Sequence, residues 1–168
     1  MTVILAAMDS DGKVKIGGDS QASTGYDYSY KLDCPKVMKI GEYLMGGTGC
    51  AATLRRFQFG INYPKPPKRN IEKFMLLTFR DSVVKQLKGV TLCARTVILF
   101  VIHDKPFELM LTINDDNTTS ALMYPSQLPV AVGCGFLSAI GAYKALVSMG
   151  AEDPIRKALE IAMEVSPG

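Results

Sequence analysis

The N-terminal residues pass from a long apolar run through a short polar turn into an alternating segment. Residues 2–8 are almost all apolar, residues 9–12 have strong turn chemistry, and residues 13–16 alternate between polar and apolar side chains. Alternation with a period of two is typical of a half-buried strand, and a short continuous apolar run is typical of a buried strand. The pattern therefore predicts a hairpin over residues 2–16 with a buried first strand.

The rest of the chain divides into segments that resemble strands and segments that resemble helices. Residues 20–35 are polar and rich in tyrosine, and residues 62–69 form a proline-rich loop. Apolar segments predict strands at residues 36–40, 43–45, 95–102, 107–113 and 130–132. Helical spacing and end signals predict helices at residues 50–59, 71–88, 136–149 and 154–165, with Asn70 and Asp153 as N-caps. Because runs of strands alternate with pairs of helices, we expect an α+β fold of antiparallel sheets packed with helices.

Composition narrows the possible functions. The chain has 168 residues, 48% of them apolar, which suits a single domain over residues 1–168. The net charge of +3 is too small to indicate a nucleic-acid partner, and no apolar run is long enough to cross a membrane. Four widely spaced cysteines predict reduced thiols and a cytoplasmic location. With one histidine and no closely spaced cysteines, we expect no metal and no cofactor.

Three residues form the most informative candidate site. Asp19 stands where one predicted strand ends and Lys36 where the next begins, so both side chains can meet near Thr2. An N-terminal threonine offers a hydroxyl nucleophile and an α-amine base, whose unperturbed pKa is about 7.7–8.0. A nearby lysine lowers the pKa of that amine, and an aspartate keeps the lysine charged and oriented. The alternative is that Asp19 and Lys36 form a plain surface ion pair.

The glycine-rich run from Gly46 to Gly49 permits two interpretations. It lacks the Lys-Ser/Thr pair of a P-loop and the third glycine of a dinucleotide fingerprint, which argues against phosphate binding. The simpler interpretation is a tight turn before a helix. The functional interpretation is that a glycine lets a backbone N–H approach a reacting carbonyl as an oxyanion donor.

These features occur in an order that resembles a known family. The N-terminal segments that carry the likeness are Thr2-Val-Ile-Leu-Ala, Ile16-Gly-Gly-Asp19-Ser-Gln-Ala-Ser23, Pro35-Lys36-Val-Met-Lys-Ile40 and Gly46-Gly47. The C-terminal segments are Ala131-Val-Gly133-Cys-Gly135 and Ile155-Arg-Lys-Ala-Leu-Glu-Ile-Ala162. Together they extend over nearly the whole chain and resemble proteasome β-type subunits, and still more the bacterial HslV peptidases, which are N-terminal-nucleophile hydrolases.

The resemblance implies a four-layer αββα sandwich of antiparallel sheets between helix layers. It implies a threonine-type peptidase that hydrolyses unfolded polypeptide by acyl transfer, with Thr2 as nucleophile and base after Met1 is removed. Asp19 and Lys36 fall on the catalytic pair of the family, and Gly47 falls on its oxyanion-hole glycine. The family assembles into double rings fed by an ATP-dependent unfoldase or cap, so we expect the chain to self-associate into rings.

The sequence also departs from the family pattern. Cys134 stands where the family has a serine, and the family strands that normally follow the fourth helix have no counterpart here, where Ser166 is the remaining candidate to support the nucleophile. We therefore expect a sandwich that lacks these C-terminal strands or receives them from a partner chain. If Met1 is retained, the Thr2 nitrogen is an amide and cannot act as a base. The alternative function is a catalytically inactive proteasome-fold protein that acts by assembly or partner binding.

Two further features concern the surface. The basic residues between Lys65 and Lys73 flank prolines, and a solvated loop is favoured there over a nucleic-acid patch. Ala139, Ala142 and Ala145 give the predicted helix over residues 136–149 a face of small side chains, which lets another element approach closely. We take this face as a further indication of a homo-oligomer.

Overall fold

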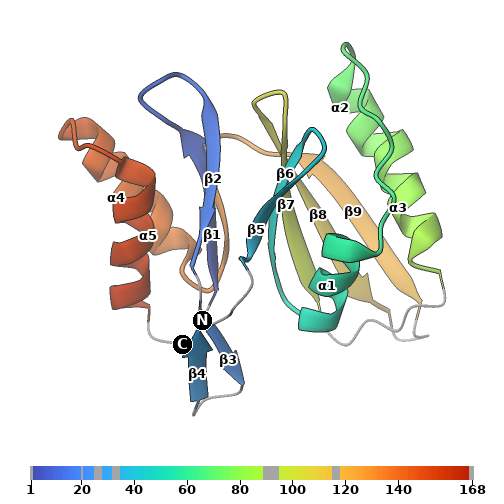
Figure 1. Cartoon of the computed structure of the whole chain (residues 1–168), viewed down its shortest axis with the longest axis horizontal. Helices are drawn as coiled ribbons and strands as arrows, with labels where there is room; N and C mark the ends of the chain where they lie inside the picture. The colour runs from blue at the N-terminus through green and yellow to red at the C-terminus, as the bar shows by residue number, and fades with distance from the viewer. Residues whose placement is uncertain are drawn as a thin grey trace.

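The computed structural model describes residues 2–19, 21–24, 28–31, 35–88, 95–114 and 118–166. Within them, the strands form two antiparallel sheets and a separate hairpin (Figure 1). The smaller sheet has three strands in the order β10-β1-β2, and the larger has five in the order β5-β6-β7-β8-β9. The prediction of an α+β fold with antiparallel sheets is confirmed.

The elements follow the chain in the order in which they are numbered. The strands are β1 (Val3–Met8), β2 (Val14–Gly18), β3 (Gln21–Thr24), β4 (Tyr28–Lys31), β5 (Val37–Ile40), β6 (Tyr43–Thr48), β7 (Thr96–Ile102), β8 (Lys105–Ile113), β9 (Thr119–Pro125) and β10 (Val130–Gly133). The helices are α1 (Ala51–Phe59), α2 (Ile71–Lys73), η1 (Phe74–Phe79), α3 (Arg80–Gln86), α4 (Phe136–Ser148) and α5 (Pro154–Val165). Because α2, η1 and α3 follow one another without a gap, they form one helical segment whose middle turns have π geometry.

The apolar run at the N-terminus becomes the central strand of the smaller sheet. Its first five residues, Val3–Ala7, are fully buried. Val3, Leu5 and Ala7 pack with α4 and α5, whereas Ile4 and Ala6 pack toward the larger sheet. Both faces of β1 are therefore covered, which explains why its sequence is continuously apolar rather than alternating.

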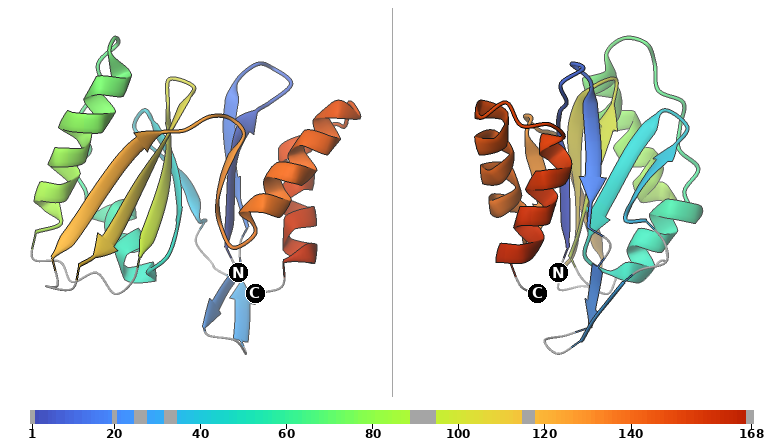
Figure 2. Two further views of the ribbon diagram at one scale, coloured as in Figure 1. Left: turned by 180° about the vertical axis from the view of Figure 1, so that it is seen from behind. Right: turned by 60° about the vertical axis from the view of Figure 1, so that its left-hand side comes forward.

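The larger sheet is also covered on both faces along β7. Ile98, Phe100 and Ile102 belong to an apolar cluster shared with α1 and the α2–α3 segment, and Leu99 and Val101 pack toward β1. Figure 2 shows α4 and α5 outside the smaller sheet and α1 and the α2–α3 segment outside the larger one. The arrangement is consistent with a sandwich in which the two sheets face each other.

Two strands extend beyond what the apolar pattern predicts. β6 continues through Gly46 and Gly47, which pair with Leu99 and Ile98 of β7, although a break was expected at this point. β9 has no predicted counterpart, because its outer position leaves alternate residues exposed and its sequence mixes threonine, serine and tyrosine with apolar residues. In both cases backbone pairing to a neighbouring strand, rather than local sequence, determines the conformation.

The two predicted N-caps differ in outcome. The Asp153 side chain accepts a hydrogen bond from the backbone N–H of Arg156 at 3.4 Å, so this cap is confirmed. The Asn70 side chain makes no capping hydrogen bond, and the prediction is wrong there. Asn70 instead has a left-handed backbone with φ of 57°, a conformation that asparagine tolerates better than most residues and that turns the proline-rich loop into the helix.

The cysteines depart from the prediction of reduced thiols. Cys50, which precedes α1 and is buried, is disulfide-bonded, so the prediction of a reduced thiol is wrong for this residue. Cys134 is a free, exposed thiol. Cys34 and Cys93 lie outside the described residues, as do Met1, Tyr26 and Gly168. None of the helices in the described part of the chain has the length and apolarity that a membrane span requires.

The apolar cluster beneath the helices of the larger sheet allows a stability test. Phe100 is fully buried and lies edge-on to Phe79, with ring centroids 5.0 Å apart. Phe100→Ala should lower the free energy of unfolding by about 3–5 kcal/mol, because it removes a large side chain and leaves a cavity. Urea denaturation followed by circular dichroism measures the loss.

The same substitution at Phe59 is the matched control, because this side chain on α1 is 74% exposed. Phe59→Ala should change the free energy of unfolding by less than about 0.5 kcal/mol. Equal losses in the two variants would contradict the assignment of Phe100 to the core.

Candidate active site

Thr2 occupies the end of the central strand of the smaller sheet. The next residue, Val3, pairs with Gly133 of β10, and Ile4 pairs with Gly18 of β2. The backbone of β1 is thus held from both sides immediately after Thr2, which is itself half-buried. A chain terminus usually frays, but pairing on both sides of a strand holds this one in place.

The structure brings Thr2, Asp19 and Lys36 together. The Lys36 Nζ atom donates to Thr2 Oγ1 at 3.0 Å and lies 2.7 Å from Asp19 Oδ2. The second carboxylate oxygen of Asp19 accepts a hydrogen bond from the backbone N–H of Val3 at 2.7 Å, and the Asp19 N–H donates to the Val3 carbonyl at 3.1 Å. The sequence reasoning from strand ends therefore placed these side chains correctly, and their contact is a feature of the fold.

The ion pair between Asp19 and Lys36 is buried, which distinguishes it from a pair on the surface. The exposed fractions of the Asp19 and Lys36 side chains are 0% and 8%, so the alternative of a plain surface ion pair is wrong. Away from water, the attraction between the two charges is much stronger than on the surface, although removing both from water is costly. Next to the hydroxyl, the Lys36 ammonium can stabilise negative charge that develops on Thr2 Oγ1.

Cys134 is a neighbour of Thr2 to which the sequence assigned no definite role. Its Sγ atom accepts from the Thr2 backbone nitrogen at 3.3 Å and lies 3.5 Å from the Thr2 carbonyl oxygen. Gly133 brings it there: this residue has φ of 103°, and a Cβ atom at its position would lie only 2.0 Å from the Thr2 carbonyl oxygen. The feature of the sequence that could have indicated this contact is the position of Cys134 between two glycines at the start of a predicted helix.

Gly47 has a clear packing role in the interior of β6. A Cβ atom there would lie 2.6 Å from Leu54 Cδ2 of α1 and 3.1 Å from the Val97 carbonyl oxygen. The absence of a side chain thus lets α1 pack closely on the larger sheet. A role of the Gly47 N–H as an oxyanion donor stays a prediction.

No described hydrogen bond or ion pair joins Ser166 or His103 to Thr2. Ser166 Oγ lies 3.2 Å from Ser138 Oγ. His103 is exposed, and its Nε2 atom lies 3.2 Å from Glu42 Oε2. Among the described residues, no three His, Cys, Asp or Glu side chains gather as ligands for a metal ion would.

Solved structures with the same fold come from Thiobacillus denitrificans. The structure of the protein BPH from this organism in complex with epoxomicin, a proteasome inhibitor, matches with a TM-score of 0.70 and 18% sequence identity. This match covers 98% of the present chain and 91% of BPH. A second BPH structure matches with a TM-score of 0.66 and 18% identity, covering 98% and 90% of the two chains.

These matches show a shared fold. The inhibitor bound to BPH suggests that this fold is proteasome-like, in line with the resemblance found in the sequence. No protein-family model matches the chain, and no curated protein sequence matches it. At 18% identity, a common fold leaves the chemistry of the present chain to be argued from its own residues.

The buried ion pair predicts a specific pattern of stability changes. Lys36→Met removes the ammonium and leaves the buried Asp19 carboxylate without this cation, so the free energy of unfolding should fall by about 3–5 kcal/mol. Replacing both residues, as Asp19→Asn with Lys36→Met, should restore at least half of the loss, because no buried charge remains and Asn still accepts from Val3. Urea denaturation of the three proteins measures both effects.

The exposed pair of Arg156 and Asp153 is the control, with side chains 67% and 52% exposed. Arg156→Met should cost less than about 1 kcal/mol. If Lys36→Met costs no more than Arg156→Met, the ion pair at Thr2 is not the buried one described.

Proposed function

We propose that this protein is a threonine-type peptidase of the HslV and proteasome β kind, which hydrolyses unfolded polypeptide. The observation that carries the proposal is the position of Lys36 Nζ, 3.0 Å from Thr2 Oγ1 and 2.7 Å from Asp19 Oδ2. A hydroxyl near the chain end, beside an ammonium whose charge is balanced, is the arrangement that catalysis by an N-terminal threonine requires. The fold shared with BPH, which binds epoxomicin, supports the proposal.

The proposed reaction begins with removal of Met1, which frees the α-amine of Thr2. Thr2 Oγ1 attacks the scissile carbonyl while the amine accepts the hydroxyl proton, and Lys36 stabilises the charge on Oγ1. The backbone N–H of Gly47 donates to the oxyanion. The C–N bond then breaks, the departing amine takes the proton from the Thr2 ammonium, and an ester remains. Water, activated by the same amine, hydrolyses this ester and regenerates Thr2.

The proposal extends to the architecture and setting of the enzyme. We infer that α4 with α5, the two sheets, and α1 with the α2–α3 segment form the four layers of an αββα sandwich. Polypeptide would reach the site through a ring assembly served by an ATP-dependent unfoldase or cap. The predicted cytoplasmic location rests on the cysteine pattern alone, and the disulfide at Cys50 speaks against a reducing compartment.

The nucleophile is tested by mass spectrometry of the purified protein with and without epoxomicin. We expect a mature chain that begins at Thr2 and gains the mass of one inhibitor molecule, because an epoxyketone requires a free N-terminal threonine. Thr2→Ala should lose adduct and peptide hydrolysis, and Thr2→Ser should keep part of both. Thr119→Ala, at a half-buried threonine of β9, is the matched control and should behave as the wild type.

A retained Met1 with no adduct would favour the alternative, an inactive proteasome-fold protein that acts by assembly or partner binding. Hydrolysis by Thr2→Ala at the wild-type rate would rule out the threonine mechanism directly.

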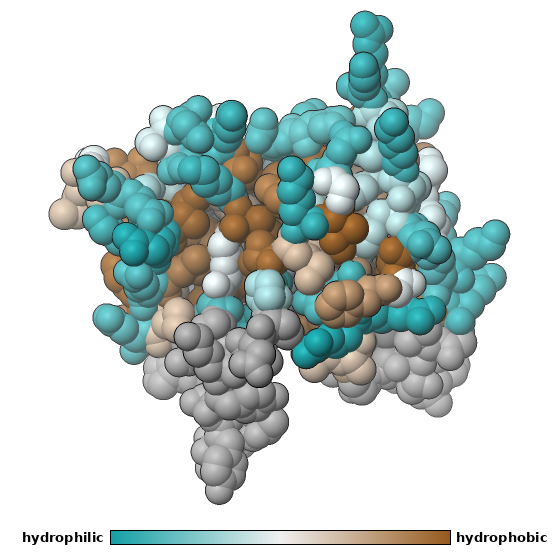
Figure 3. Space-filling model, in the orientation of Figure 1, coloured by the Kyte–Doolittle hydropathy of each residue, from teal (hydrophilic) through white to brown (hydrophobic). Residues whose placement is uncertain are grey.

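Self-association is the part of the proposal that both functions share. Apolar side chains gather on the surface over α4 and α5 (Figure 3), and six of the eleven exposed large apolar residues of the described chain lie between Phe136 and Val165. Ala139, by contrast, is fully buried against α5 within the chain, so the small-residue face serves partly in internal packing. Exposed apolar surface of this kind favours association.

We expect a stable homo-oligomer at micromolar concentration, measured by sedimentation velocity. Leu137→Asp with Met149→Asp should dissociate it, since these side chains are 71% and 79% exposed and a charge at a contact is unfavourable. Leu122→Asp on β9, at a residue 54% exposed, is the control and should leave the assembly intact. A monomeric wild-type protein would remove the chamber and, with it, the reason to expect a self-enclosed protease.

A further inference from the structure

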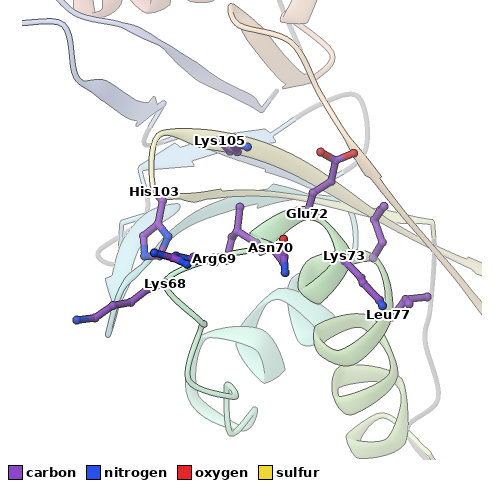
Figure 4. A pocket seen from close by; sticks show the side chains of 10 residues that line it. Lys68, Arg69, Asn70, Glu72, Lys73, Leu77, His103 and Lys105 are labelled. Atoms are coloured by element: carbon purple, nitrogen blue, oxygen red, sulfur yellow. The ribbon is translucent and has the colours of Figure 1, made fainter.

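A second polar site lies far from Thr2, where the α2–α3 segment begins. A hollow of about 820 Å³ is bounded by the start of this segment and by the turn between β7 and β8 (Figure 4). The charged side chains that line it are Lys68, Arg69, Glu72, Lys73, His103 and Lys105. The segment between Lys65 and Lys73 is predicted from the sequence to be a solvated loop, and part of it forms one wall of this hollow.

The hollow has an excess of positive charge. No carboxylate of the described chain lies within ion-pair distance of Lys68, Arg69, Lys73 or Lys105. Glu72 is the single acidic residue of the lining, and Glu42 nearby faces His103 instead. These four side chains are exposed, and their shared positive charge favours an anionic ligand.

The backbone adds to this field. The helical segment over residues 71–86 starts at the hollow, and the side chain of Asn70 makes no capping hydrogen bond there. The first N–H groups of a helix have no partners within the helix, and they carry a partial positive charge. The backbone contribution thus has the same sign as that of the four side chains.

The site is separate from the candidate active site. In the pairing of β6 with β7, Thr48 lies opposite Val97 at one end, and Leu44 lies opposite Val101 at the other. Lys36, whose ammonium contacts Thr2, directly precedes Val37, and Val37 on β5 pairs with Gly46 of β6. Lys36 therefore lies near the Thr48 end of β6. His103 follows β7 at the Leu44 end, so the hollow and Thr2 occupy opposite ends of the larger sheet.

We propose that this hollow binds a compact polyphosphate group, of the kind carried by a nucleoside triphosphate or by inorganic polyphosphate. Phosphates concentrate several negative charges in a small volume and can match several cations that line one hollow, whereas an acidic peptide supplies one charge per residue along an extended chain. Arg69 offers a planar fork that matches two phosphate oxygens, and the lysines act as point charges. Ile71, Leu76 and Leu77 form an apolar part of the lining on which a base can rest.

Binding of sodium tripolyphosphate and of ATP, without added metal, to the full-length protein by isothermal titration calorimetry tests the inference. The wild-type protein should bind tripolyphosphate with an affinity that falls as sodium chloride is raised. Arg69→Ala with Lys73→Ala should weaken binding about a hundredfold, about tenfold for each lost charge-assisted contact. Lys39→Ala with Lys144→Ala removes the same charge from exposed positions outside the hollow and should bind as the wild type.

Three outcomes would overturn the proposal, and the comparison of ATP with tripolyphosphate distinguishes the two sources of the phosphate group. Absence of binding overturns it, and so does an equal loss in the two double variants, which would mean unspecific attraction to net charge. Tighter binding of a hexaglutamate peptide than of tripolyphosphate would identify a protein-docking surface instead. Tighter binding of ATP than of tripolyphosphate would assign the site to nucleotides. Equal binding of the two would show that the site recognises the phosphate chain alone. Epoxomicin labelling of the Arg69→Ala, Lys73→Ala protein reports on Thr2 independently, so the two proposals can fail separately.

Discussion

The Asp19 carboxylate is held from two sides, and it positions both the backbone next to Thr2 and the ammonium beside the Thr2 hydroxyl. One oxygen accepts from the backbone of Val3 at the start of β1, and the other lies 2.7 Å from the Lys36 ammonium just before β5. Because β1 and β5 belong to different sheets, this single side chain connects them at the end where Thr2 lies. Burial strengthens the attraction between the two charges, although taking both of them out of water is costly.

The packing of β1 holds the backbone next to Thr2, the candidate nucleophile, in place. The strand lies between β10 and β2 and is covered by α4 and α5 on one face and by the larger sheet on the other. Gly133 lets the β10 backbone approach Thr2 closely enough to bring Cys134 against the Thr2 nitrogen. The apolar run that identifies β1 in the sequence is therefore also what fixes the first residue of the site in space.

Sequence reasoning succeeds here where the information is local or lies at the ends of strands. The hairpin of β1 and β2 and the four helical segments follow from apolar periodicity, and the meeting of Asp19 with Lys36 follows from their positions at strand ends. It fails where a distant partner decides the outcome: Gly46 and Gly47 continue β6 because β7 pairs with them, and β9 forms because β8 does. The contact of Cys134 with Thr2 likewise depends on residues far apart in the chain.

The energetics of the ion pair also bear on the choice between an enzyme and an inactive protein of the same fold. A buried ion pair often contributes no more to stability than well-packed apolar side chains of the same volume, and often less. The Asp19 carboxylate contacts the backbone of Val3, whose side chain belongs to an apolar cluster, so an apolar pair would suit this position for stability alone. The Lys36 ammonium lies 3.0 Å from the Thr2 hydroxyl, and in the proposed reaction it stabilises charge on that oxygen, which an apolar residue could not do. Under the proposed mechanism, the chemistry of Thr2 accounts for the cost of burying the pair.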